Sequence, residues 1–203
     1  MMSVSARPGM RSMLIAAVVT ASLFTAAGHD VARAADAAAP VHYTSDPAKS
    51  SFEYQFSQAG ALNKGKFTKY TVTLDAAGDT LSKLDVVVEM GSLDTGDKER
   101  DDTLKSADLF SVARFPQSHF TSTQITRTAS GYDAAGKLTI RGVSRDVHVP
   151  FTFRIADGQG VLSGKTAIKR LDYGVGQGDW KATDQVGNDV TVSFAIRLAP
   201  AAH

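Results

Sequence analysis

Hydrophobic and polar residues alternate along most of the chain from Ser51 onwards. Phe52, Tyr54 and Phe56 alternate with polar neighbours, and the same period of two recurs in seven later segments. Such a period places an apolar row and a polar row on opposite faces of a β-strand. The pattern predicts eight strands, around residues 52–56, 70–74, 84–90, 118–126, 137–141, 147–155, 161–169 and 190–198. In the sixth of these, the predicted inward row is Val147, Val149, Phe151, Phe153 and Ile155.

The connections indicate antiparallel pairing. Residues 75–78, 133–136 and 157–160 each carry Asp followed by Gly, a composition that supplies the positive φ of hairpin turns, so we predict three loops there. Antiparallel sheets with one wet face show this alternation, whereas buried parallel sheets do not. Closing eight such strands into a barrel removes both sheet edges and turns the apolar face inward. A two-sheet sandwich would bury the same face and is the structural alternative.

Residues 94–115 show no alternation and predict a short helix that joins two strands. Asp94 or Thr95 is suited to cap its start. Asp101 and Lys105 stand four residues apart, in the order that favours an ion pair on a helix.

The first 34 residues have the features of a secretory signal peptide. Arg7 and Arg11 precede a 15-residue run, 13–27, that is too short to span a membrane, which takes about 20 residues. Small residues follow, and 32–34 reads Ala-Arg-Ala, the A-x-A cleavage pattern. We therefore expect a leader at 1–34, a flexible strap at 35–40 and one domain at 41–203, exported and without a membrane span after cleavage. An uncleaved membrane anchor is the alternative.

Charge and cysteine content exclude several classes of function. Lys and Arg number 22 against 21 Asp and Glu in 203 residues, so the chain lacks the cationic field of a nucleic-acid-binding protein. With no cysteine, disulfides, zinc ribbons and thiol nucleophiles are excluded.

Nucleophile-elbow, zinc-protease and phosphate-loop motifs are missing, so we predict neither a catalytic residue nor a metal site. His119 and His148 are expected at the surface.

Aromatic residues fill the inward rows, and this admits two interpretations. They can form an ordinary packed core, or they can form the wall of an apolar pocket. A hydrocarbon chain buried in such a pocket gains about 0.8 kcal/mol for each CH₂ removed from water. An eight-stranded barrel has room either for side chains alone or for one small ligand.

Five segments, in order, resemble motifs of the YceI-like family of lipid- and polyisoprenoid-binding proteins. Residues 100–110 resemble R-D-x-H-L-x-S-x-D-F-F, and 115–122 resemble F-P-x-x-x-F-x-S. Residues 136–143 are similar to G-x-L-T-I-x-G-V, 170–174 to R-x-D-F-G, and 186–190 to V-G-D-x-V. Thr103 stands where the first motif has histidine, and Leu109 where it has phenylalanine.

The resemblance implies a periplasmic, lipocalin-like barrel that carries a polyisoprenoid, an isoprenoid quinone or a fatty lipid, without catalysis and with no other cofactor. The expected ligand-binding residues are Tyr54, Phe56, Leu104, Phe110, Phe120, Phe151, Phe153, Trp180 and Phe194. Leu104 and Phe110 are included from their motif positions. Two alternatives stay open, namely an enzyme acting on a barrel-bound lipid and a filled-core β module that binds a protein partner. A homodimer and a membrane redox partner are likewise left open.

Overall fold

The computed structural model describes residues 39–201. Its strands are β1 (Val41–Ser45), β2 (Ser51–Gln58), β3 (Ala61–Phe67), β4 (Tyr70–Ala77), β5 (Thr80–Glu89), β6 (Leu93–Asp94), β7 (Gln117–Thr128), β8 (Gly131–Ile140), β9 (Val143–Ala156), β10 (Gln159–Lys169) and β11 (Val186–Pro200). The helices are α1 (Lys98–Lys105) and the short 3-10 helices η1 (Pro47–Lys49), η2 (Met90–Ser92), η3 (Arg170–Tyr173) and η4 (Gly178–Lys181). The predicted leader, 1–34, and residues 35–38 of the predicted strap lie outside the described residues.

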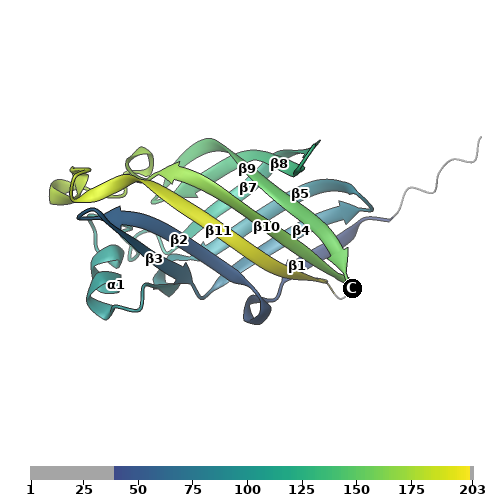
Figure 1. The fold of residues 1–203 in the computed structure, drawn as a ribbon, viewed down its shortest axis with the longest axis horizontal. Coiled ribbons are helices and arrows are strands. Elements are labelled where there is room, and N and C mark those ends of the chain that lie inside the picture. Colours follow the sequence, from purple (N-terminus) through teal and green to yellow (C-terminus); the bar gives the residue numbers. More distant parts are fainter. Residues whose placement is uncertain (1–38, 202–203) are drawn as a thin grey trace, which may run out of the picture. The chain divides into compact units, whose positions relative to one another are not determined.

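β1 closes the sheet into a barrel. The strands follow the order β1-β4-β5-β7-β8-β9-β10-β11 around the ring, and β11 pairs back with β1 (Figure 1). Tyr43 of β1 lies opposite Pro200 of β11 on one side and Leu74 of β4 on the other, and both pairings are antiparallel. The prediction of a mainly β, eight-stranded antiparallel barrel with one short helix is confirmed. The sandwich alternative is wrong.

At one end of the barrel, a different set of strands forms the wall. β1 and β2 pair one after the other with the same edge of β11, and β2 continues the sheet through β3 to β6. Figure 1 shows α1 and the segment that holds η3 and η4 at this end, with the chain's C-terminus at the opposite end. We call the first the helix end and the second the far end.

Alternation along the strands builds the core as predicted. In β4, Tyr70, Val72, Leu74 and Ala76 are buried, while the residues between them are exposed or half-buried. In β9, Val147, Val149, Phe151 and Phe153 are buried or half-buried and the residues between them are exposed, but Ile155, the next to last residue of the strand, is 55% exposed. The predicted inward position of Ile155 is therefore wrong, because the strand has reached the hairpin at the barrel rim.

Of two loops predicted from Asp and Gly residues, one is a turn and the other lies inside a strand. Asp157 and Gly158 have φ of 54° and 72° and make the two-residue turn between β9 and β10, as predicted. The loop predicted at 133–136 is wrong, because these residues lie inside β8. A Cβ on Gly136 would lie 2.4 Å from the carbonyl oxygen of Thr121. That glycine therefore permits close strand approach and makes no turn.

The N-cap of the predicted helix lies two or three residues later than expected. Asp97, and neither Asp94 nor Thr95, is the N-cap, and its carboxylate accepts a hydrogen bond from the backbone N–H of Arg100 at 3.1 Å. The 75–78 loop is likewise displaced, since 75–77 belong to β4.

Asp101 also departs from its predicted role. Its Oδ1 accepts hydrogen bonds from the backbone N–H and the hydroxyl of Thr95, at 2.9 and 2.7 Å. The expected ion pair with Lys105 is wrong, because the carboxylate is already engaged by the segment that leads into α1.

Candidate ligand-binding site

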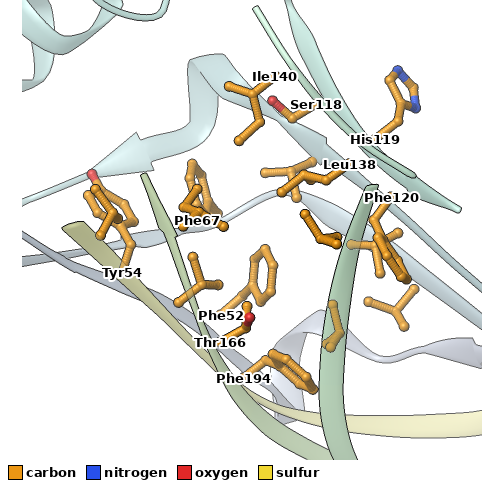
Figure 2. A pocket seen from close by; sticks show the side chains of 18 of the residues that line it. Phe52, Tyr54, Phe67, Ser118, His119, Phe120, Leu138, Ile140, Thr166 and Phe194 are labelled. Atoms are coloured by element: carbon orange, nitrogen blue, oxygen red, sulfur yellow. The ribbon is translucent and has the colours of Figure 1, made fainter. Parts of the chain in front are cut away.

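The interior of the barrel holds an apolar cavity of about 150 Å³, which we call the inner cavity. Its wall comes from β2–β5 and β7–β11 with η2 and the segment after α1, and Figure 2 shows the side chains converging on it. Only Tyr54, Ser118, His119 and Thr166 of its 23 wall residues carry polar side-chain atoms. Apolar cavities of this size stay dry, so the space is suited to hydrocarbon.

The inner cavity does not extend to the far end of the barrel. The last wall residues toward the far end are Val72, Leu84, Phe120, Val149, Leu162 and Ile196. Beyond them lies a packed cluster that we call the far-end plug, made of Tyr43, Leu74, Ala76, Leu81, Tyr132, Ala134, Phe151, Phe153 and Leu198. The ring of Phe151 stacks on Tyr132 at 5.5 Å, and Phe153 meets Tyr43 edge-on at 5.8 Å. The barrel is therefore hollow toward the helix end and solid at the far end.

A second cavity of about 80 Å³, the helix-end cavity, adjoins the first. The two share Tyr54, Phe110, Ile140, Ile168 and Val190 as wall residues. Unlike the inner cavity, it is lined by charged side chains, those of Arg100 and Arg170, and Gln58 and Thr103 add polar groups. An elongated amphipathic molecule with one polar end matches this sequence of environments.

Arg170 fastens residues 174–187, the segment that covers the helix-end cavity. Its side chain is 4% exposed and donates hydrogen bonds to the backbone carbonyls of Val175, Ala182, Val186 and Gly187, at 2.7 to 3.3 Å. Burial lowers the pKa of the Arg170 guanidinium, which nevertheless stays charged because arginine does not deprotonate in proteins. The carbonyl dipoles thus compensate a buried charge and hold the segment in place.

The sequence motifs meet around this segment. Asp108, in the first motif, accepts hydrogen bonds at its carbonyl from the N–H groups of Gly176 and Gln177, at 2.9 and 2.8 Å. Asn188, in the fifth, accepts one from the N–H of Leu171, in the fourth, at 3.1 Å. Residues that are widely separated in sequence therefore build one end of the barrel.

Tyr54 places a hydroxyl in an apolar setting. The residue is 5% exposed, and its hydroxyl has no hydrogen-bond partner among the described residues. The hydroxyl lies over Gly65, where a Cβ would approach within 2.5 Å. Burial, and next the negative charge of Asp101, raise the pKa of Tyr54, so the group is neutral at physiological pH.

The structure brings seven of the nine expected ligand-binding residues to the cavities. Tyr54, Phe110, Phe120 and Phe194 border the inner cavity, and Tyr54, Phe56, Leu104, Phe110 and Trp180 border the helix-end cavity. Phe151 and Phe153 lie in the far-end plug, outside both walls. Inward alternation marks all core-facing residues alike and does not separate wall from plug.

Other wall residues were not expected as ligand contacts. Phe52 and Val192 lie on predicted inward rows, so alternation alone was sufficient to find them. Met90 ends the predicted apolar row of residues 84–90, whereas Phe67 ends a segment without clear alternation. Thr103, the residue in place of the motif histidine, borders the helix-end cavity and donates its hydroxyl hydrogen to the carbonyl of Glu99 at 2.9 Å.

His119 and His148 are exposed. The Nδ1 of His148 lies 2.6 Å from a carboxylate oxygen of Asp133. His119 borders the inner cavity, but Figure 2 shows its imidazole pointing away from it. Within residues 39–201, no cluster of three or more His, Asp or Glu residues is arranged to hold a metal ion. The same residues include no helix long and apolar enough to cross a membrane.

Comparison with known proteins adds a family to this geometry. A family model described as the YceI-like domain matches residues 43–198. The UPF0312 protein YE1254 of Yersinia enterocolitica is 38% identical over 85 residues, which are 41% of this chain and 44% of that protein. Protein YceI of Salmonella arizonae is 39% identical over 77 residues, 38% of this chain and 40% of its own. The matched stretches span about two fifths of each curated relative.

Solved structures resemble the whole described barrel. The crystal structure of Burkholderia cenocepacia BcnA has a TM-score of 0.71 and 30% identity, and the match covers 75% of this chain and 98% of that one. A polyisoprenoid-binding domain from Saccharophagus degradans, implicated in plant cell wall breakdown, has a TM-score of 0.59 at 16% identity, over 80% of this chain and all of the other. At that identity, the second likeness supports the fold alone.

Proposed function

Since this chain belongs to the YceI-like domain family, we propose that it is a periplasmic carrier of a long apolar ligand with one polar end. The polyisoprenoid-binding description of the Saccharophagus degradans relative is consistent with a prenyl chain as the apolar part. The observation that supports this proposal most directly is the inner cavity, which is lined by side chains that are almost all apolar. Burial of hydrocarbon there provides affinity without specific polar contacts.

The proposed orientation follows from the two cavities. The tail occupies the inner cavity, and the polar end meets Arg100, Thr103 and Arg170 in the helix-end cavity. Arginine side chains in this wall favour a head that accepts hydrogen bonds, such as a quinone carbonyl or a phosphate. A role in catalysis on the bound lipid is less well supported, because the imidazoles of His119 and His148 face away from the inner cavity.

The test is identification of the molecule that accompanies the native protein. The full chain, exported with its own leader in a Gram-negative host, is purified without detergent, and native mass spectrometry with solvent extraction identifies bound lipid. We expect a prenyl lipid or a related long-chain molecule. Ligand-free preparations that also fail to take up added prenol or quinone would refute the proposal.

A pair of variants connects binding to the cavity. Val192→Asp places a charge in the inner cavity and should abolish uptake, since an unpaired carboxylate is strongly disfavoured in a dry space. Thr191→Asp changes the neighbouring residue on the opposite face of β11 and should bind as the wild type does. Thermal unfolding of both variants separates lost binding from lost folding. Equal uptake by the two would contradict a ligand in the barrel.

A further inference from the structure

The boundary between the inner cavity and the far-end plug can be followed along several strands. On β9, Val149 borders the cavity while Phe151, the next inward residue, belongs to the plug. On β11, Ile196 borders the cavity while Leu198 is fully buried in the plug. On β10 and β5, the wall residues Leu162 and Leu84 lie directly opposite the plug residues Phe153 and Leu74, so the plug adjoins the cavity and forms its floor.

The plug is held by specific contacts. Tyr132, stacked on Phe151, also donates its hydroxyl hydrogen to the carbonyl of Asp79 at 3.1 Å, which ties it to the turn between β4 and β5. Ala134 is fully buried beside these rings, since its register partner is Val149 and the next pair on the two strands' inward face is Tyr132 with Phe151. Close-packed interiors of this kind resist insertion of further atoms.

The hollow part has a definite length. Val190 and Ile196 mark its two ends on β11, and six residues of strand span about 20 Å along the strand. A tail that enters from the helix end is therefore free to extend until it meets the floor and no further.

We infer that the far-end plug, with Phe151 on Tyr132 as its central stack, sets the tail length up to which binding affinity increases. The inference rests on the proposed function. Each added isoprene unit should increase affinity more than about tenfold while it still enters the cavity, because it removes several CH₂ equivalents from water. Once the tail reaches the floor, added units stay outside and affinity becomes constant. The length at which this change occurs is the breakpoint.

The experiment measures dissociation constants of the full chain, stripped of lipid, for all-trans prenols of increasing length. Phe151→Ala opens the floor and should move the breakpoint to longer prenols. Val149→Phe fills the cavity next to the floor and should move it to shorter ones. Thr152→Ala, on the outer face of β9, is the matched control and should leave it unchanged. Phe151→Leu replaces Phe151→Ala if the latter does not fold.

The outcomes separate this inference from the proposed function. Opposite shifts in the two variants support the plug as the length stop. A wild-type affinity that keeps rising without a breakpoint, or one breakpoint shared by all variants, overturns the inference but leaves lipid binding intact. A wild-type chain that binds none of the prenols overturns the proposed function itself.

Discussion

The phenyl ring of Phe194 lies across Gly164, its direct partner on the neighbouring strand β10. A Cβ on Gly164 would lie 2.4 Å from the ring and 2.6 Å from the carbonyl oxygen of Pro150. The missing side chain thus lets an aromatic wall residue lie flat against the barrel and leaves the space above it open. Similar pairs join Gly136 to Phe120 and Gly160 to Phe153.

Gly164→Ala should therefore displace the ring of Phe194 into the inner cavity. We expect a loss of about 1–3 kcal/mol in the free energy of unfolding, because overpacking strains a tight core, together with weaker prenol binding. Denaturant unfolding and a binding titration check both. Gly91→Ala is the control, since its nearest neighbour is 3.8 Å from the new Cβ. A Gly164→Ala protein with wild-type stability would show that Phe194 moves without cost.

Arg170→Met should release the segment that covers the helix-end cavity. Four carbonyls lose a charged donor, so the free energy of unfolding should fall by about 3 kcal/mol or more. Amide hydrogen exchange should speed up across residues 174–187 and change little in β5 or β8. Arg154→Met, at an exposed position of β9, should remain within about 0.5 kcal/mol of the wild type. Unchanged exchange in 174–187 would refute the fastening role.

Tyr54→Phe should alter the response to alkaline pH more than the stability at neutral pH. The raised pKa means that the folded state keeps the Tyr54 proton more tightly than the unfolded chain, whose ordinary value is 10.0. The stability linked to this group is thus fully present below about pH 10 and is lost as pH rises further. Tyr54→Phe should therefore lose less stability above pH 10 than the wild type.

At pH 7 the same variant should match or exceed wild-type stability, because the buried hydroxyl it removes has no partner among the described residues. Tyr132→Phe is the contrast: it removes a hydroxyl that donates to Asp79 and should cost about 1 kcal/mol. Denaturant unfolding across pH 7–11 measures both effects. A Tyr54→Phe variant that is clearly less stable at pH 7 would indicate a hydrogen bond to bound ligand or water.

The leader gives a prediction that depends on sequence alone. We expect the exported chain to begin at Ala35 and to appear in the periplasmic fraction. N-terminal sequencing and osmotic-shock fractionation are the measurements. A retained leader in the membrane fraction would support the uncleaved anchor.

Much of the barrel was predictable because a period of two reports directly which face of a strand is buried. All eight predicted segments coincide with strands, apart from Met90 and Arg141 at the ends of two segments, but β1, β3 and β6 were missed. In β3 the residues facing inward include Asn63 and Gly65, while Leu62 points outward and is 73% exposed. Gly65 is inward because the ring of Tyr54 covers it. Long-range packing therefore reversed the local pattern.

The candidate site was less predictable than the fold. Alternation placed Phe120 and Phe151 on inward rows, but only the three-dimensional level along the barrel separates the first, at the cavity, from the second, in the plug. Arg170 gave no local signal for burial either, since its four acceptors are backbone carbonyls of a segment that carries no pattern of its own.

A barrel that is closed at its far end offers a ligand a single opening. A ligand that enters tail first, with its polar end last, must also leave with its polar end first, through the same opening. The donor and the recipient of such a molecule would then contact the same end of the barrel, around α1 and the segment fastened by Arg170, one after the other. They could not bind simultaneously at opposite ends.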